Sequence, residues 1–268
     1  MADFNKSYKF NIVKSPVDNR DYLLESIYPV SVELPLVWDM RPQLTPIRDQ
    51  GSQGTCSAQT AACMKEWQEK VDQGLSGHMS PQFVYNLRPN IGSEGMYPRD
   101  TMDILRNTGI VSEEQFPYNT MKKPNAGLLK YAEKNKIEGY AQIGTIASLK
   151  TALYANGPCY IAFPVYNANK MEFWKQDYAN QPSMGGHAVT VVGYLEDSFI
   201  IRNSWSTAWG DQGYTYFKFA DWGMQWECWT ALDADSNPEG LMKKLESRKT
   251  REEKVGFFAR MFGKKIKK

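Results

Sequence analysis

Histidine and cysteine are scarce in this sequence. The 268 residues include only two histidines and four cysteines. Their spacings match no zinc site, and four cysteines in a chain of this length do not build a dense disulfide framework. A phosphate-binding glycine loop is also missing. The sequence therefore predicts no metal site, and its few thiols and imidazoles become the first places to look for chemistry.

Long apolar runs are missing as well. No stretch reaches the roughly 18 apolar residues that a membrane-spanning helix needs, and residues 1–7 lack the apolar run of a secretory signal. Cys63, Cys159 and Cys228 are best interpreted as buried apolar side chains. Together these observations predict an intracellular, reducing setting.

Charge of one sign dominates only near the C-terminus. The net charge of the chain is +2, but residues 241–268 carry a net +8 and the other 240 residues a net −6. Four apolar residues of this tail fall on one helical face: Val255, Phe258, Phe262 and Ile266. Residues 239–268 have three interpretations: a solvated charge run, an amphipathic helix on a membrane surface, or a contact for nucleic acid or another acidic partner. The acidic body argues against nucleic-acid binding by the rest of the chain.

Helical patterns fill the first half of the chain and strand patterns the second. Periodicity and capping residues predict helices over 57–71, 80–86, 99–107 and 148–155. Runs rich in β-branched and aromatic residues predict strands over 159–165, 187–194, 198–203 and 214–219. This order predicts an α+β protein with a helical lobe, a sheet lobe and a functional site between them.

Cys56 stands at the predicted start of the first long helix. There the helix dipole and backbone N–H groups would lower the pKa of its thiol. His187 beside it would supply an imidazolium, and Asn203 would hold the far imidazole nitrogen. The Gln50 amide, together with the Cys56 N–H, would form an oxyanion hole. Trp205 would shield the bond between His187 and Asn203 from water.

Each of these residues alone has an ordinary structural explanation. A lone cysteine near a helix start is usually inert, and a lone histidine in an apolar strand is usually structural. Their joint order and spacing change that balance, because His187 and Asn203 follow Cys56 by 131 and 147 residues. His78 is the other imidazole. It lies in a loop without a comparable setting and is interpreted as a surface residue.

The motifs around these residues resemble those of the papain family of cysteine peptidases. The entry into the family's oxyanion-hole motif is similar to the segment with Leu34-Pro35, Trp38-Asp39, Arg41 and Thr45–Gly51. Gly185–Tyr194 is similar to the family's histidine strand, and Asn203–Tyr214 to its asparagine signature. The resemblance covers about residues 34–235. It implies a papain-like fold with a helical N-terminal lobe, an antiparallel β-barrel-like C-terminal lobe and an active site in the cleft between them. We assign the peptidase domain to residues 34–238.

The resemblance implies an endopeptidase that cleaves polypeptides through an acyl-enzyme and needs no cofactor. Cys56 would be the nucleophile, His187 the general base and then acid, Asn203 the orienting residue and Gln50 the oxyanion donor. Two alternatives stay open. One is a catalytically silent papain-fold protein with a binding or structural role. The other is an acyl transferase or deamidase that uses the same Cys-His-Asn chemistry.

The resemblance also locates the substrate groove. Gly95–Pro98 is similar to the glycine-rich edge that hydrogen-bonds the substrate backbone, with Met96 where a second glycine is usual. Ala162 and Ala188 would line the pocket for the residue second from the scissile bond, and such small walls would admit a sizeable apolar side chain. The predicted substrate-binding residues are Gly95, Met96, Tyr97, Pro98, Ala162, Gly186, Ala188 and Trp205.

The first 33 residues form a short polar leader. They are much shorter than the folded inhibitory pro-domains that many family members carry. The leader either lies in the cleft as a minimal autoinhibitor or packs elsewhere on the surface, and surface packing is the interpretation preferred from sequence. Gln53 stands where the family usually has a disulfide cysteine, which fits a reducing compartment.

Overall fold

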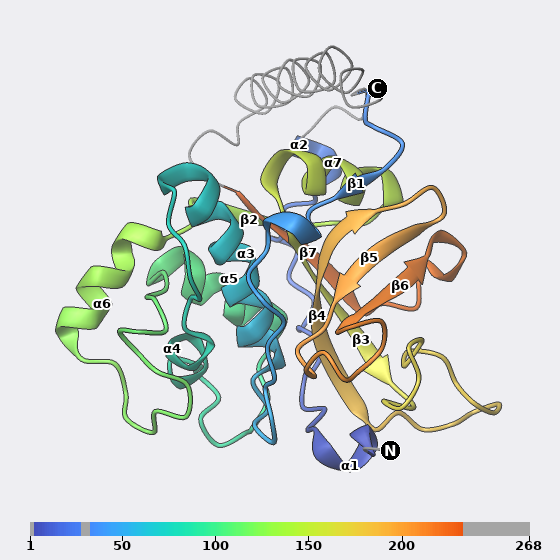
Figure 1. Ribbon diagram of the computed structural model, residues 1–268, viewed down its shortest axis with the longest axis horizontal. Helices are drawn as coiled ribbons and strands as arrows, with labels where there is room; N and C mark the ends of the chain where they lie inside the picture. Colours follow the sequence, from blue (N-terminus) through green and yellow to red (C-terminus); the bar gives the residue numbers. More distant parts are fainter. Residues whose placement is uncertain (1–2, 28–32, 233–268) are drawn as a thin grey trace, which may run out of the picture.

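The computed structural model describes residues 3–27 and 33–232. The predicted tail over 239–268 lies outside this part, and so does the end of the predicted peptidase domain. Most of the longer helices gather on one side of the molecule and the sheet on the other, whereas the helix over residues 146–156 packs against the sheet (Figure 1). In the described ranges, none of the helices combines the length and the apolar character needed to cross a bilayer.

The sheet lobe is built from one antiparallel sheet. Its path runs β2-β7-β3-β4-β5-β6, and β1 pairs with the end of β4. The strands are β1 (Trp38–Asp39), β2 (Gly139–Gln142), β3 (Cys159–Val165), β4 (Gly185–Tyr194), β5 (Ser198–Arg202), β6 (Tyr214–Lys218) and β7 (Glu227–Leu232). Strands β3, β5 and nearly all of β4 are buried on both faces. The path has two ends, β2 and β6, so within the described residues the predicted barrel-like sheet is not closed.

The helical lobe centres on the longest helix, α3. The longer helices are α3 (Cys56–Gln73), α4 (Pro81–Asn86), α5 (Pro98–Asn107), α6 (Ala126–Ala132) and α7 (Ile146–Asn156). Three single turns of 3-10 helix accompany them: η1 (Arg41–Gln43), η2 (Glu133–Asn135) and η3 (Phe219–Asp221). Helix α3 ends at Gly74, whose φ of 68° is in the left-handed region that glycine adopts at low cost. Helix α4 starts where sequence predicted, because Ser80 Oγ accepts a hydrogen bond from the Phe83 N–H.

The two lobes share an apolar interface around the start of α3. Cys56, Ala58 and Ala61 of this helix pack in one buried cluster with Ala162 of β3 and Ala188 of β4. These side chains are small, so the helix approaches the sheet closely. The contact brings the first residue of α3 to the middle strands of the sheet.

The N-terminal leader spans the molecule. It contains two short helices, α1 (Phe4–Ser7) and α2 (Leu24–Ile27), which lie at opposite ends of the fold (Figure 1). Between them, residues 8–15 form a segment that we call the strap. The strap passes between the two lobes, and its contacts are part of the site described next.

Candidate active site

Cys56 is the first residue of α3. The preceding residue, Thr55, makes no capping hydrogen bond with its side chain, so the N–H groups of the first turn keep their polarity toward the sulfur. The backbone N–H of Ala188 also faces the Cys56 thiol. Because Ala188 directly follows His187, the fold brings the nucleophile candidate to the predicted histidine strand.

His187 lies on β4 and is fully buried. Its Nε2 is 2.8 Å from Oδ1 of Asn203. An amide oxygen can only accept, so Nε2 carries the proton and Nδ1 is the basic nitrogen. Among the described residues, Nδ1 has no hydrogen-bond partner. The imidazole is thus held in the tautomer that leaves Nδ1 available to a thiol.

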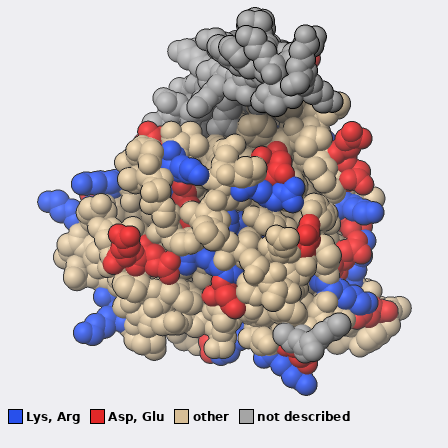
Figure 2. Space-filling model, viewed as in Figure 1, with Lys and Arg blue, Asp and Glu red and all other residues tan. Residues whose placement is uncertain are grey.

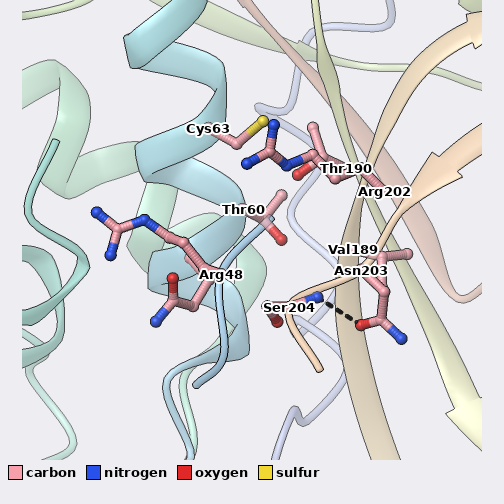
Figure 3. Close-up of a pocket in the computed structure, with 9 residues that line it drawn as sticks. Arg48, Thr60, Cys63, Val189, Thr190, Arg202, Asn203 and Ser204 are labelled. Carbon is pink, nitrogen blue, oxygen red and sulfur yellow. Dashed lines mark hydrogen bonds between the residues drawn. The ribbon is translucent and has the colours of Figure 1, made fainter. Parts of the chain in front are cut away.

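Asn203 is fixed from behind by the backbone. The Ser204 N–H donates to its Oδ1 at 2.8 Å, so that oxygen receives two hydrogen bonds. Figure 3 shows this bond at the edge of a small polar pocket, with Thr60 and Cys63 on the helix side and Asn203 and Ser204 on the sheet side. Two donors on one oxygen restrict rotation of the Asn203 amide, and with it the ring of His187.

Aromatic rings enclose the imidazole. The ring of Trp205 stacks on His187 with centroids 4.2 Å apart and an angle of 24° between the planes. Phe173 approaches the imidazole edge-on at 5.6 Å. Both rings are buried. They keep water from the hydrogen bond between His187 and Asn203, the role that sequence predicts for Trp205.

The Gln50 side chain is buried and oriented. Its Oε1 accepts from Ser204 Oγ at 2.7 Å, and its Nε2 donates to the Gln53 carbonyl at 3.0 Å. The backbone N–H of Gln50 donates to the Ser204 carbonyl at 2.9 Å. An amide nitrogen has two N–H donors, and Gln53 uses one of them. The other donor is what a developing oxyanion would need.

The strap covers this site. Its backbone pairs with Gly186: the Ile12 N–H donates to Gly186 O at 3.1 Å, and the Gly186 N–H donates to Phe10 O at 3.2 Å. Tyr8 stacks on Trp205 with centroids 5.3 Å apart. The expectation that this part of the leader packs elsewhere on the surface is therefore wrong, because its apolar residues find their burial in the groove.

Glycines allow this close approach. A Cβ on Gly95 would lie 1.6 Å from the Asn11 carbonyl oxygen, and a Cβ on Gly186 would lie 2.5 Å from the Ile12 carbonyl oxygen. The Ile12 side chain is buried in the cluster that contains Cys56, Met96, Ala162 and Ala188. The strap thus touches most of the residues predicted to bind substrate. Tyr97 and Pro98 begin α5, and their role in substrate binding stays a prediction.

Charged and polar contacts hold the strap at its edges. Lys9 Nζ lies 2.5 Å from a carboxylate oxygen of Glu94, and Asn11 Nδ2 donates to the other oxygen at 3.2 Å. The Tyr8 hydroxyl donates to Asp49 Oδ1 at 3.0 Å. Surface contacts of this kind each contribute little. Burial of the strap's side chains Tyr8, Phe10 and Ile12 therefore dominates its attachment.

Under the strap the two reactive groups are uncharged. Burial raises the pKa of the Cys56 thiol to about 11. Burial also lowers the pKa of His187 to about 3, although the hydrogen bond to Asn203 opposes this change. At neutral pH the pair is therefore a thiol and a neutral imidazole, not the ion pair that sequence predicts, because both groups are cut off from water.

Glu227 is a polar residue of the groove that sequence did not single out. It lies opposite Ala162 in the antiparallel register of β3 and β7, so both side chains point to the same face of the sheet. One carboxylate oxygen accepts from the Ser15 N–H at 2.7 Å and the other from Trp229 Nε1 at 2.8 Å. No motif marks Glu227; only strand pairing brings it to the pocket.

Two other residues differ from their sequence interpretation. Met96 is fully buried, so its side chain points into the core. His78 is partly buried, with Nδ1 3.2 Å from a carboxylate oxygen of buried Glu66.

Comparison with known proteins gives a consistent result. A cathepsin L-like peptidase from Aedes aegypti is 30% identical over 233 residues, 80% of this chain and 65% of the relative. Cathepsin K from Gallus gallus is 31% identical over 194 residues, 66% of this chain and 56% of the relative. The solved structure of xylellain, a cysteine protease from Xylella fastidiosa, shares 25% identity with a TM-score of 0.73, covering 84% of this chain and 96% of that one.

The chain spans less than two thirds of the length of these two curated relatives. Residues 34–229 match the family model described as papain family cysteine protease. This match covers most of the chain and contains the helix start, the histidine strand and the asparagine motif that form the site. The chain belongs to the papain family of cysteine proteases.

Proposed function

We propose that this chain is a papain-like cysteine endopeptidase that is held latent by its own leader. The observation that carries the proposal is the state of His187. Its Nε2 is bound to Asn203, while its Nδ1 has no partner among the described residues and lies on the strand that faces the Cys56 sulfur. This arrangement suits proton exchange between a thiol and an imidazole.

The reaction follows from these positions once the strap has left. His187 Nδ1 takes the thiol proton, and the Cys56 sulfur attacks the carbonyl carbon of the scissile bond. The Gln50 amide and the Cys56 N–H stabilise the oxyanion. His187 then gives its proton to the leaving amine, and the C–N bond breaks. Water, deprotonated by the same imidazole, hydrolyses the acyl-enzyme and regenerates the thiol.

The proposed substrates are polypeptides with a large side chain second from the scissile bond. Ile12 of the strap fills the pocket walled by Ala162 and Ala188, which supports a preference for apolar residues of similar size. Glu227 at the same face of the sheet adds an acceptor for a long basic side chain. A peptide-library profile that prefers acidic residues at this position would contradict the proposal.

A pair of full-length variants tests latency and activity together. Ile12→Asp puts a charge into the apolar pocket and is expected to release the strap, whereas Val13→Asp alters the neighbouring side chain, which is 49% exposed. We expect a peptide epoxide or vinyl sulfone to label Ile12→Asp at least tenfold faster than Val13→Asp or wild type. Labelling must vanish with Cys56→Ala. Absence of labelling in every variant would support a silent papain-fold protein.

Product analysis separates hydrolysis from the remaining alternative. The Ile12→Asp variant is incubated with casein, with and without an excess of amine donors. Shorter peptides with free carboxyl ends would support the endopeptidase. Conjugated amines, or deamidated side chains without chain cleavage, would support an acyl transferase or deamidase instead.

The basic tail is a separate proposal. Residues 241–268 carry a net +8 and several aromatic residues. We propose that this tail contacts an anionic membrane surface. We also propose that the peptidase works in a reducing intracellular compartment. On the face shown in Figure 2, charges of both signs are interspersed over the described body. Deletion of 241–268 is therefore expected to abolish binding to vesicles that contain phosphatidylserine. Unchanged vesicle binding after this deletion would remove the membrane idea.

A further inference from the structure

The two proposed oxyanion donors lie on either side of residues 51–55. Gln50 precedes this segment, and Cys56 follows it as the first residue of α3. Their N–H groups can bind the same oxygen only while the loop and the helix start keep a fixed separation. Gly51 and Ser52 between them are exposed. The segment itself therefore does little to fix that separation, and another part of the fold must do so.

Tyr118 places its hydroxyl between these two parts of the site. It lies in the loop over residues 117–120 of the helical lobe. The phenol donates to the Gln50 backbone carbonyl at 2.7 Å, and its oxygen is 2.7 Å from Oγ1 of Thr55, the residue before Cys56. A phenol has one proton, and Gln50 receives it, so Thr55 is the donor in the second bond. Thr55, Tyr118 and Gln50 thus form a directed chain of two hydrogen bonds.

Gln50 is held from both lobes. Ser204 of the sheet lobe accepts from the Gln50 N–H at 2.9 Å and donates to its Oε1 at 2.7 Å. Tyr118 ties the carbonyl of the same residue to the helical lobe, which also carries Cys56. Loss of the Tyr118 hydroxyl would leave Gln50 attached to Ser204 but less well placed relative to the start of α3.

Thr55 is drawn away from the helix start by the same contact. It stands at the N-cap of α3, where a threonine hydroxyl usually accepts a hydrogen bond from an N–H of the first turn. It makes no such bond here, and its hydroxyl is bound to Tyr118 instead. Thr55 is fully buried, so its hydroxyl is shielded from solvent. The N–H groups of the first turn therefore remain available to the Cys56 sulfur and to an oxyanion.

The loop that carries Tyr118 is itself braced. The Asn119 N–H donates to Oε1 of Gln82 at 3.0 Å, and Gln82 lies on α4 and is 2% exposed. The Thr120 hydroxyl donates to the Pro117 carbonyl at 2.6 Å. Burial raises the pKa of Tyr118, so its phenol keeps the proton that it donates throughout the neutral range. The support is thus fixed in position and in protonation state.

We propose that Tyr118 is a positioning residue of the oxyanion hole, whose hydroxyl sets the separation between the Gln50 amide and the Cys56 N–H. This role rests on the proposed function, because an oxyanion hole has a use only if the chain performs acyl transfer. Tyr118 takes no part in the chemistry itself. It follows Gln50 by 68 residues and lies outside the motifs that carry the other site residues.

The first test removes single hydroxyls from the full-length Ile12→Asp enzyme. We expect Tyr118→Phe to lower kcat on a peptide substrate about tenfold with little change in KM, because a displaced donor matters mainly in the transition state. Thr55→Val removes the other hydroxyl of the chain and should lower kcat as well. Tyr194→Phe is the matched control. Its phenol donates to the Pro35 carbonyl at 3.1 Å, at the end of β4 away from His187, and its loss should leave both constants unchanged.

A double-mutant cycle separates positioning of Gln50 from general support of the fold. In a Gln50→Ala chain the donor that Tyr118 positions is gone, so Tyr118→Phe should then lower kcat by less than about threefold. A loss of about tenfold in both backgrounds would overturn the proposal, because Tyr118 would then act through something other than Gln50.

Two further results would count against this role. Unchanged kcat in both Tyr118→Phe and Thr55→Val, with an active Ile12→Asp parent, would refute it while the proposed function stands. A parent that is labelled by no peptide epoxide and cleaves no peptide would refute the proposed function, and the positioning role with it.

Discussion

Trp205 connects the proposed catalytic residue His187 to the strap. One face of its indole stacks on His187 at 4.2 Å, and Tyr8 of the strap stacks on it at 5.3 Å. The same ring therefore shields the imidazole from water and provides a docking surface for the leader. Departure of the strap would uncover the indole without disturbing the bond between His187 and Asn203.

Gln50 offers a direct test of the oxyanion hole. In the Ile12→Asp background, we expect Gln50→Ala to lower kcat about 10²- to 10³-fold with little change in KM, because the lost donor acts mainly in the transition state. Steady-state kinetics on a peptide substrate measure both constants. Gln53→Ala is the matched control, since its half-buried side chain contacts Asn119 and not the site. A fall in kcat of less than tenfold would argue against this role.

Glu227 is expected to widen substrate preference. In the Ile12→Asp background, peptides with Lys second from the scissile bond should be cleaved with a kcat/KM similar to that of peptides with Leu at the same position. Glu227→Gln should then reduce kcat/KM for the Lys peptide by about tenfold, equivalent to about 1.4 kcal/mol, and leave the Leu peptide nearly unchanged. Glu133→Gln, on an exposed turn, is the control. Equal losses for both peptides would mean that Glu227 only supports the fold.

The role of a residue could be predicted from sequence where its neighbours in the chain form a recognisable motif. Cys56 starts a helix, Asn203 precedes Ser204 and Trp205, and their spacing points to one site. The position of Glu227 in the groove could not be predicted, because it depends on the strand register with Ala162, which no single motif encodes. The uncharged state of Cys56 and His187 could not be predicted either, because it depends on which segment of the chain covers them.

At the scale of elements, the strap has two effects on reactivity. It would exclude a substrate from the groove, and it separates Cys56 and His187 from water. The second effect keeps the pKa of Cys56 near 11 and that of His187 near 3. A latent molecule of this kind is protected from thiol reagents as well as from substrates.

The pH dependence of alkylation checks this second effect. In the uncut chain, only about one Cys56 in 10⁴ is thiolate at pH 7, because a raised pKa leaves less thiolate at any given pH. Its reaction with iodoacetamide should therefore increase about tenfold per pH unit up to about pH 11. Ile12→Asp should already react quickly at pH 7. Cys56→Ala corrects for the other thiols, and identical profiles for both chains would contradict the prediction.

Residues 21–27 of the leader lead to a second prediction at this scale. Leu24 is 1% exposed and belongs to the core of the sheet lobe, so Leu24→Ala leaves a cavity there and should lower the free energy of unfolding by about 3 kcal/mol. Tyr22→Ala, two residues away but 70% exposed, should change it by less than about 0.5 kcal/mol. Chemical denaturation of both variants measures the difference. Equal stabilities would mean that Leu24 is not part of the folded core.

The main elements could be predicted because their patterns are strong. Strand β3 has the predicted bounds, and α3, α5 and α7 differ from prediction by at most two residues at either end. Helices α1, α2 and α6 and strands β1, β2 and β7 were not predicted. Strand β2 is four residues long and begins with glycine, and β7 becomes a strand through its pairing with β2 and β3. Such short strands are specified by their neighbours more than by their own residues.

At the scale of the whole molecule, the site exists only where the lobes meet. Helix α3 supplies the sulfur, β4 supplies the imidazole, and the leader fills the groove between them. The predicted cleft location is thus correct, while the predicted surface location of the strap is not. Leader and body form one folded unit, in which the strap lies in the groove that we propose as the substrate site.

A free leader peptide should imitate this arrangement. A synthetic peptide of residues 3–18 is expected to inhibit the Ile12→Asp enzyme in competition with substrate, since both use the same groove. The same peptide with Ile12→Asp should be at least tenfold weaker, because the substitution puts a charge into an apolar pocket. Initial rates at several substrate concentrations measure both. Noncompetitive inhibition would place the peptide elsewhere.

The Gly186 N–H and carbonyl both form hydrogen bonds with the strap. A polypeptide substrate would need the same backbone groups. The strap and a substrate therefore cannot bind at the same time. Kinetic constants measured on the intact chain depend on the equilibrium by which the strap leaves the groove as well as on the affinity of the groove for substrate. The apparent KM is then raised by the reciprocal of the open fraction. Permanent removal of the strap would lower the apparent KM, although the binding surface itself would be unchanged.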